Sequence, residues 1–327
     1  MKLSAPIETT VYHVGAAGGL HRSWQDYPGI LTYVCFDPEE GAAAELQEIA
    51  DKTDNPRLRL CAEARPVFSR NGTIDFHIYD VPMLSSVFLL DREVTHRYRY
   101  SNIRHLNTTR MNCSTIDDIA LMRREAPDSL IIDAQGAGLA ILEGASKALA
   151  STIVSVRVEV EFIPLYTDQP LFDQVWAFMR SRGFRLVRLE KCGSGETGFS
   201  TDAGPFSCSM GDGVPAWADA IFLKIPTMEE WSSKPSQESA AFLFKFVLFA
   251  LCNRIGSVGL DLVFELAQRN LLAQIMESLS IADQELLINR VLAQLDQCEG
   301  STWETQEERR RIFHMEQQKL RAILRSL

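Results

Sequence analysis

The sequence has no excess of basic residues, and this absence bears first on its partners. Its 327 residues include 33 Lys and Arg against 43 Asp and Glu, which gives a formal net charge of -10 at pH 7. A protein whose main partner is nucleic acid needs a basic face that neutralises phosphates. We therefore expect no nucleic-acid partner.

The chain also lacks paired cysteines. Its seven cysteines are odd in number and scattered, and no two of them form a C-x-x-C pair. Such usage fits reduced thiols better than a disulfide framework or a zinc site. Residues 1–6 contain no long apolar core, so no signal peptide is expected there. These features predict a cytoplasmic protein.

No apolar run is long enough to cross a membrane. The run at residues 240–251 is nearly continuous, but Lys245 interrupts it and Asn253-Arg254 ends it. A spanning helix needs about 20 apolar residues. We expect a buried or interface helix here and no transmembrane segment.

Short apolar runs alternate with helix-like segments up to residue 226. Strands are expected over residues 11–14, 31–36, 58–62, 130–133, 153–162, 184–189 and 218–225, with an antiparallel addition at 74–79. Helices are expected over about 40–52, 139–149 and 171–182, and another begins at about residue 114. The alternation predicts an α/β fold with a doubly wound, mostly parallel sheet.

The pattern changes after Pro226. From Ser236 onward there is neither a strand pattern nor a proline, and apolar residues from Phe244 to Leu262 follow one helical stripe. Further helices are expected over 280–296 and 302–327. We expect an α/β domain at 1–226 and a helical extension at 227–327, which packs on that domain or forms a homo-oligomer with a second copy.

A glycine-rich turn follows the first expected strand. Gly15, Gly18 and Gly19 can bring backbone N–H groups close to a ligand, and Asp37 ends the next strand, where it can accept ribose hydroxyls. The spacing differs from the G-x-G-x-x-G of dinucleotide enzymes. It favours an adenosyl ligand without a diphosphate, or only a tight strand-to-helix turn.

Two later strands end on acids. Asp133 closes one of them, and Glu159 and Glu161 share one face of the other. Loops at the carboxyl ends of parallel strands hold ligands, and buried carboxylates are costly unless they are paired. Asp133 is therefore a candidate site residue, and Glu159 and Glu161 are either site residues or partners of Arg157 or a nearby helix arginine.

Several motifs occur in a fixed order along this region. They are Ser114-Thr-Ile-Asp-Asp-Ile119, Leu130-Ile-Ile-Asp-Ala-Gln-Gly136, Ile141-Leu-Glu-Gly-Ala145, Glu159-Val-Glu-Phe-Ile-Pro-Leu-Tyr166, Gln169-Pro-Leu-Phe172, Arg182-Gly-Phe184 and Ala218-Asp-Ala-Ile-Phe222. Together they resemble the FkbM-type methyltransferases over roughly residues 11–224. The resemblance implies a Rossmann-like class I methyltransferase fold. It also implies S-adenosylmethionine as methyl donor and a hydroxyl of a carbohydrate or small molecule as acceptor.

The resemblance also implies which residues hold the donor. They are His13, Gly15, Ala16, Gly18, Asp37, Ser86 and Gln135. Two positions depart from the family pattern. His13 stands where an aspartate usually helps to hold the methionine end of the donor, and Gly138 stands where a glutamate is usual.

The three acids are the candidate catalytic residues. Asp133, Glu159 or Glu161 could take the proton of the acceptor hydroxyl as a general base. Asp133 and Glu161 could alternatively bind a Mg²⁺ ion that acidifies the acceptor.

Two other functions fit parts of the sequence. One is a non-catalytic binding or scaffold protein that keeps the methyltransferase fold and assembles through its helical tail, which His13 and Gly138 would explain. The other is a nicotinamide-dependent oxidoreductase. The glycine spacing disfavours it, and no Tyr-x-x-x-Lys motif is present.

Overall fold

The computed structural model describes residues 3, 5–16, 19–97, 103–195, 214–227, 229, 237–299 and 307–326. The chain forms two compact units. The α/β unit contains residues 10–20 and 32–225, and the helical unit contains residues 1–9, 21–31 and 226–327. The helical unit therefore includes two N-terminal segments as well as the C-terminal helices.

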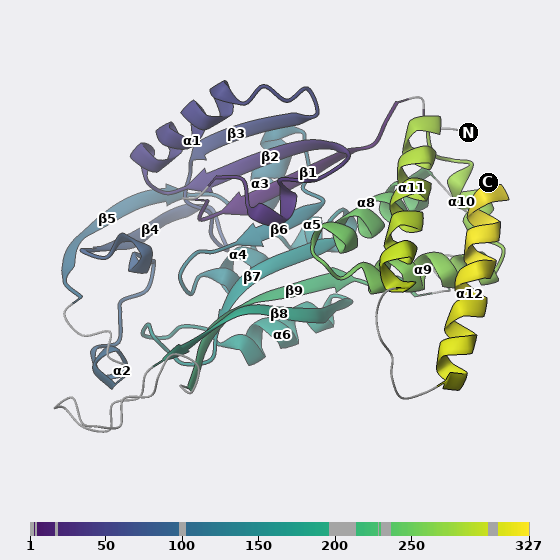
Figure 1. Ribbon diagram of the computed structural model, residues 1–327. Coiled ribbons are helices and arrows are strands. Elements are labelled where there is room, and N and C mark those ends of the chain that lie inside the picture. Colours follow the sequence, from purple (N-terminus) through teal and green to yellow (C-terminus); the bar gives the residue numbers. More distant parts are fainter. Residues whose placement is uncertain are drawn as a thin grey trace. The chain divides into compact units, whose positions relative to one another are not determined.

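A seven-stranded sheet forms the centre of the α/β unit (Figure 1), with the order β3-β2-β1-β6-β7-β9-β8. The strands are β1 (Glu8–Val14), β2 (Ile30–Asp37), β3 (Leu58–Ala64), β6 (Ser129–Ile132), β7 (Ser155–Glu161), β8 (Phe184–Gly195) and β9 (Val214–Lys224). Strand β6 pairs in parallel with β1 and β7, whereas β9 is antiparallel to β7 and β8. The expected α/β fold with a mostly parallel sheet is confirmed.

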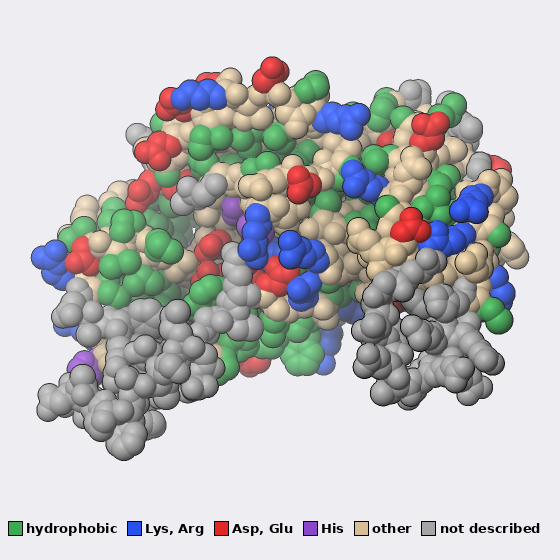
Figure 2. Space-filling model, viewed as in Figure 1, with side chains coloured by type: hydrophobic (Ala, Val, Ile, Leu, Met, Phe, Trp, Pro, Cys, Tyr) green, Lys and Arg blue, Asp and Glu red, His purple; other side chains and the backbone are tan. Residues whose placement is uncertain are grey.

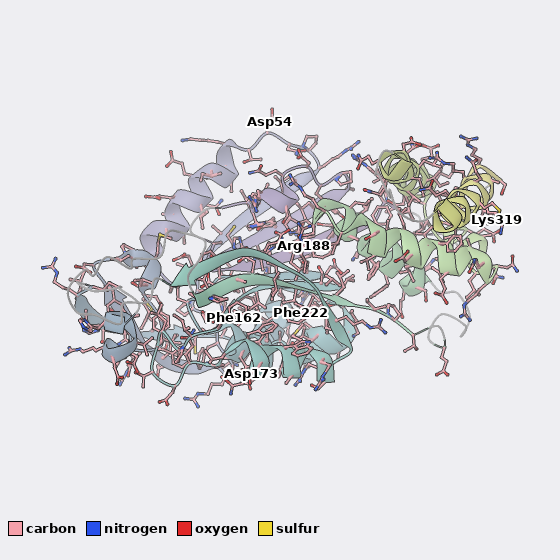
Figure 3. All side chains as sticks on the ribbon, turned by 60° about the horizontal axis from the view of Figure 1, so that its bottom comes forward. Asp54, Phe162, Asp173, Arg188, Phe222 and Lys319 are labelled. Carbon is pink, nitrogen blue, oxygen red and sulfur yellow. The ribbon has the colours of Figure 1, made fainter. Side chains whose placement is uncertain are left out.

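Most helices of the α/β unit flank this sheet, and one short helix, α2 (Arg92–Arg97), lies away from it (Figure 1). The others are α1 (Glu40–Lys52), α3 (Ile116–Arg123), α4 (Gly138–Glu143), α5 (Ser146–Ser151) and α6 (Phe172–Ser181). Helix α1 packs beside β3, α6 packs on β7 and β8, and α3 packs on α5. Phe162 and Phe222 lie on the side of the sheet that faces α6 (Figure 3). The helix expected at 139–149 is two helices, which are separated at Gly144 and Ala145, where Gly144 lies against the backbone of Phe68.

A separate two-stranded sheet consists of β4 (Gly72–Tyr79) and β5 (His105–Cys113), which pair antiparallel. The antiparallel strand expected at 74–79 is confirmed, but its partner is β5 and not the central sheet. Strand β5 has mostly polar, exposed residues and so carries no apolar pattern that predicts a strand. A short 3₁₀ turn, η2 (Pro82–Leu84), follows β4.

The helical unit contains five helices among its described residues. They are α8 (Gln237–Cys252), α9 (Gly256–Gln268), α10 (Leu272–Met276), α11 (Ile281–Glu299) and α12 (Glu307–Ser326). The apolar stripe from Phe244 to Leu262 is not one helix, since Arg254 takes a left-handed conformation between α8 and α9. None of the helices in the described ranges is both long and apolar enough to span a membrane.

The N-terminal segments belong to the helical unit through specific contacts. The Ile7 N–H donates to Asp283 Oδ2 over 3.1 Å. Trp24, in the 3₁₀ turn η1 (Arg22–Trp24), packs its ring on Phe249 of α8, with centroids 5.7 Å apart. A division by sequence position alone misses these contacts, because they join residues more than 200 positions apart.

The charged side chains are mixed in sign. Several Lys and Arg side chains gather beside an acidic side chain near the centre of the visible face, and elsewhere on that face the two signs are interspersed (Figure 2).

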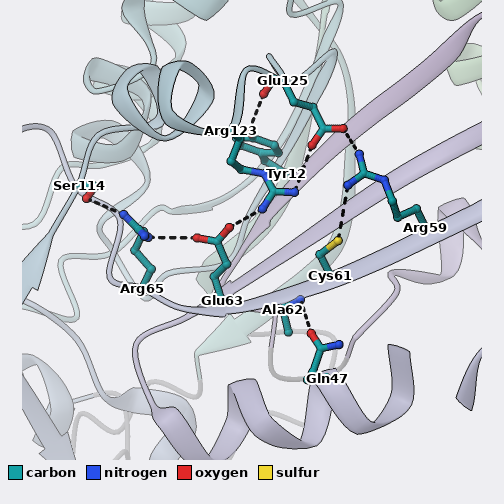
Figure 4. Close-up of polar contacts among 10 residues, drawn as sticks. All are labelled: Tyr12, Gln47, Arg59, Cys61, Ala62, Glu63, Arg65, Ser114, Arg123 and Glu125. Carbon is teal, nitrogen blue, oxygen red and sulfur yellow. Dashed lines mark hydrogen bonds and ion pairs between the residues drawn. The ribbon is translucent and has the colours of Figure 1, made fainter. Parts of the chain in front are cut away.

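An ion-pair network joins three parts of the α/β unit (Figure 4). Arg123, at the end of α3, contacts Glu63 of β3 and Glu125. Arg59 also contacts Glu125, whose backbone oxygen accepts a 2.6 Å hydrogen bond from Tyr12 of β1. The Arg123 side chain is only 20% exposed. Because its neighbours are acids, removing it would take one of two cations from each half-buried carboxylate, leaving Glu63 with Arg65 and Glu125 with Arg59.

We expect Arg123→Ala to lower the free energy of unfolding by about 2 kcal/mol, since breaking a largely buried network costs more than losing a surface pair. Urea denaturation measures the change. The matched control is Arg110→Ala, which removes the exposed pair with Asp75 and should cost less than about 0.5 kcal/mol. Equal losses in both variants would contradict the prediction.

Candidate functional site

The ends of three neighbouring strands meet at a glycine turn. After β1, the N–H groups of Gly15 and Ala16 donate to the backbone oxygen of Phe36 over 2.9 and 3.3 Å. Gly15 has φ +76°, and a Cβ there would lie 1.7 Å from the backbone oxygen of Asp133. The turn thus lies directly against the ends of β2 and β6. Gly18 lies outside the described residues.

Asp37 is held beside this turn. Its Oδ1 accepts a 2.9 Å hydrogen bond from the Glu39 N–H. The side chain is 7% exposed, and burial raises the pKa of its carboxyl. A carboxyl fixed at the end of the strand next to β1 can accept ribose hydroxyls, as the sequence predicts.

His13 lies in β1 itself, one residue before the strand ends. It is buried, and its Nδ1 is 2.9 Å from the Tyr33 hydroxyl, with the two rings edge to face. Its neighbours Tyr12 and Val14 belong to the apolar core, so the alternation of the strand turns His13 to the other face. Tyr33 therefore satisfies one ring nitrogen, and contact of His13 with a donor stays a prediction.

The turn after β6 brings several expected site residues together. Gln135 and Gly136 have φ +48° and +87°. The Gln135 amide donates to Asp133 Oδ1 over 3.0 Å, and Ser86 Oγ donates to the Gln135 backbone oxygen over 2.6 Å. Tyr166 donates to Gln135 Oε1 over 3.3 Å. Side chains from two distant segments, Ser86 and Tyr166, together with the adjacent Asp133, therefore fix this turn.

Asp133 and Glu159 form a carboxyl pair. Burial, followed by the negative charge of Asp133, raises the pKa of Glu159 far above its ordinary value, and the two side chains share a hydrogen bond. At neutral pH Glu159 is therefore protonated and donates to the Asp133 carboxylate. Asp133 is the exposed member of the pair. The pair carries one negative charge where two strands end side by side.

Glu161 has a different environment. It is 6% exposed, and the Gly136 N–H donates to its carboxyl. Burial raises the pKa of Glu161 to about 8, while the Gln169 amide opposes the shift. Its contacts place Glu161 beneath the turn, where it supports the backbone.

Arg157 is the alternative partner expected for Glu159 and Glu161, and it forms ion pairs with two other acids. Arg157 contacts Asp219 over 3.2 Å and Glu190 over 3.0 Å. Among the described residues, no group of three or more His, Cys, Asp or Glu side chains could hold a metal ion. No such group supports the Mg²⁺ site considered for Asp133 and Glu161, and that site stays a prediction.

Packing explains one departure from the family pattern. A Cβ on Gly138 would lie 2.7 Å from Val158 Cγ2 and 3.4 Å from the backbone oxygen of Glu159. The start of α4 is therefore too close to β7 for a side chain, and glycine is required for this contact.

Sequence reasoning missed two residues of the site. Tyr33 pairs with His13, and Gln169 lies between Tyr166 and Gly136. Gln169 stands in one of the ordered motifs, which is a signal of its importance. Tyr33 has no comparable signal, because it reads as one more apolar strand residue.

Comparison with known proteins agrees with this geometry. The family model described as the methyltransferase FkbM domain matches residues 36–186. No curated protein matches the chain significantly. One similar solved structure is Sp1610 of Streptococcus pneumoniae, a proposed tRNA (m1A22) methyltransferase. It has 10% identity and a TM-score of 0.31, with 98% of this chain and 95% of that chain covered. A likeness at that score carries no argument here.

Replacing Gly15 should disturb the site most directly. Gly15→Ala places a Cβ against the Asp133 backbone and forces alanine into a left-handed conformation. We expect a loss of at least about 2 kcal/mol in unfolding free energy, measured by urea denaturation. Gly41→Ala is the control, because nothing lies within 4 Å of its Cβ position in α1. It should be neutral or stabilising by up to about 1 kcal/mol.

The raised pKa of Glu159 should make stability depend on pH. The folded state holds this proton more tightly than the unfolded state, whose pKa is near 4.5. Stability is therefore lost as pH rises from that value through the raised pKa, by up to about 1.4 kcal/mol per pH unit.

Glu159→Gln keeps the side chain neutral and removes this contribution. We expect its unfolding free energy, measured from pH 5 to 8, to exceed that of the wild type by a margin that grows with pH. Glu143→Gln, at an exposed position of α4, is the control, and its unfolding free energy should change with pH in the same way as that of the wild type. A constant margin for Glu159→Gln would show that the carboxyl is ionised throughout.

Proposed function

We propose that this chain, in which residues 36–186 are an FkbM-type methyltransferase domain, methylates a hydroxyl of a carbohydrate or small-molecule acceptor. The family implies S-adenosylmethionine as the donor. The observation that carries the proposal is the Asp133–Glu159 pair, which lies at the sheet edge next to the Gly15 turn. A base beside the donor turn is what methyl transfer to oxygen requires.

The donor would lie along the edge formed by β2, β1 and β6. The N–H groups of the Gly15–Ala16 turn and the carboxyl of Asp37 flank the place for an adenosyl group. Ser86 and Gln135 lie on the β6 side, joined by their 2.6 Å hydrogen bond. When bound, the sulfonium of the donor supplies an already activated methyl group. The protein has mainly to align the reactants, which can lower the barrier by about 7–11 kcal/mol.

Asp133 is the proposed general base. It is exposed and ionised next to a protonated Glu159, so it can take the proton of the acceptor hydroxyl while the oxygen forms its bond to the methyl carbon. The carbon–sulfur bond breaks and the sulfur becomes neutral. Glu159 stabilises the Asp133 carboxylate by its hydrogen bond, and Glu161 supports the turn above it. A positioned base contributes about 10²–10⁴-fold to the rate.

A second candidate function is a non-catalytic scaffold with the same fold. The observation that favours it is the His13–Tyr33 hydrogen bond, which stands where the family has a donor-binding acid. The helical unit exposes Ile281 and Met315, to 67% and 57%, which a second copy of the chain could cover. Binding of the donor separates the two functions, because only the enzyme requires it. The cytoplasm remains the proposed location.

Calorimetry with S-adenosylhomocysteine tests the proposal. We expect the wild type to bind it, and Asp133→Asn to bind it with similar affinity. In a mass-spectrometric assay with S-adenosylmethionine and a panel of monosaccharides, Asp133→Asn should lower methyl transfer by about 10²–10⁴-fold. Glu143→Gln should leave transfer unchanged. If the wild type does not bind S-adenosylhomocysteine up to millimolar concentration, the proposed enzymatic function is wrong and the scaffold function is favoured.

A further inference from the structure

Gln169 closes the loop that follows β7. Its Oε1 accepts a 3.0 Å hydrogen bond from the Tyr166 N–H, and the side chain is 6% exposed. Between the two residues, Asp168 has a positive φ of +58°. A left-handed residue inside a short loop is stable only where neighbouring contacts fix the loop. The Gln169 side chain supplies one of these contacts.

The same side chain lies beneath the turn after β6. A Cβ on Gly136 would lie 3.1 Å from Gln169 Nε2 and 3.2 Å from its Cγ. The amide also faces the Glu161 carboxyl and lowers its pKa against the effect of burial. The Gln169 side chain thus packs against the Gln135–Gly136 turn. The Gly136 N–H of this turn donates to the Glu161 carboxyl.

These contacts form a closed ring. From Gln169 it passes to Tyr166, whose hydroxyl donates to Gln135, and it returns through Gly136 to Gln169. Gln135 in turn donates to Asp133. We infer that Gln169 is a positioning residue, which holds the Gln135–Gly136 turn and the Tyr166 loop in the arrangement that binds the donor. The inference rests on the proposed function for the identity of its ligand.

Stability and positioning can be separated at this residue. Gln169 Nε2 is buried, and its contact with the Glu161 carboxyl falls short of a hydrogen bond of normal length and angle. A buried donor with so weak a contact costs stability. Gln169→Met keeps the length of the side chain, removes this donor and loses the bond to Tyr166. Removal of the donor should stabilise the fold, and loss of the bond to Tyr166 should destabilise it. We therefore expect the melting temperature to change by less than about 3 °C.

The test measures donor-site binding and local order in the full chain. We expect Gln169→Met to weaken binding of S-adenosylhomocysteine about tenfold by calorimetry. Hydrogen exchange followed by mass spectrometry should become faster in residues 133–137 and 164–169. The control is Gln174→Met. It removes a similar hydrogen bond, which the Leu171 N–H donates to the side chain of an exposed glutamine. It should leave both measurements unchanged.

Wild-type affinity in a folded Gln169→Met variant overturns the inference, and so do equal effects of Gln174→Met. Gln169→Glu keeps an oxygen that accepts from Tyr166 but adds a carboxyl beside Glu161, so it is measured near pH 5, where both carboxyls can hold their protons. Its exchange at 164–169 should stay nearer to the wild type than that of Gln169→Met. If the wild type itself binds no S-adenosylhomocysteine, the proposed function is wrong. Unchanged exchange in Gln169→Met would then refute the positioning role separately.

Discussion

The close approach of Gly15 to the backbone oxygen of Asp133 is the contact on which the site depends. It is possible only without a side chain, since a Cβ would lie 1.7 Å from that oxygen. The parallel pairing of β1 with β6 sets the approach, because Val14 lies opposite Ile132 and both strands end there. The hydrogen bonds of the same turn to Phe36 add the end of β2. One residue without a side chain therefore lets three strand ends form a single edge.

Charge is the second constraint at this edge. Several acids lie on β7, β8 and β9 or just after β6, and their charge is compensated in different ways. Arg157 neutralises Asp219 and Glu190, Glu159 keeps its proton beside Asp133, and the Gly136 N–H holds Glu161. Two adjacent ionised carboxylates would repel one another. The result is one exposed carboxylate with a neutral neighbour, which is the form that a base beside a cationic donor needs.

Much of the fold follows from local patterns in the sequence. Buried parallel strands are often continuous apolar runs, so β2 and β6 could be predicted from the sequence. Strand β7 could be predicted as well, because it alternates valines with charged residues. Strand β5 could not, because its stability comes from pairing with β4 and its residues are polar and exposed. The break between α4 and α5 was also hidden. At this break Gly144 lies against the backbone of Phe68, 76 positions away in the chain.

The sequence by itself determined the fold class, the family motifs and the acids at the strand ends, because each depends on residues close together in the chain. Only the tertiary structure decided how these residues differ in role. It separated the paired Asp133 and Glu159 from the buried Glu161, gave His13 a partner in Tyr33, and placed Gln169 beneath Gly136. Protonation and hydrogen bonding depend on burial and on neighbours from distant segments. Neither burial nor these neighbours can be inferred from residues that are close together in the sequence.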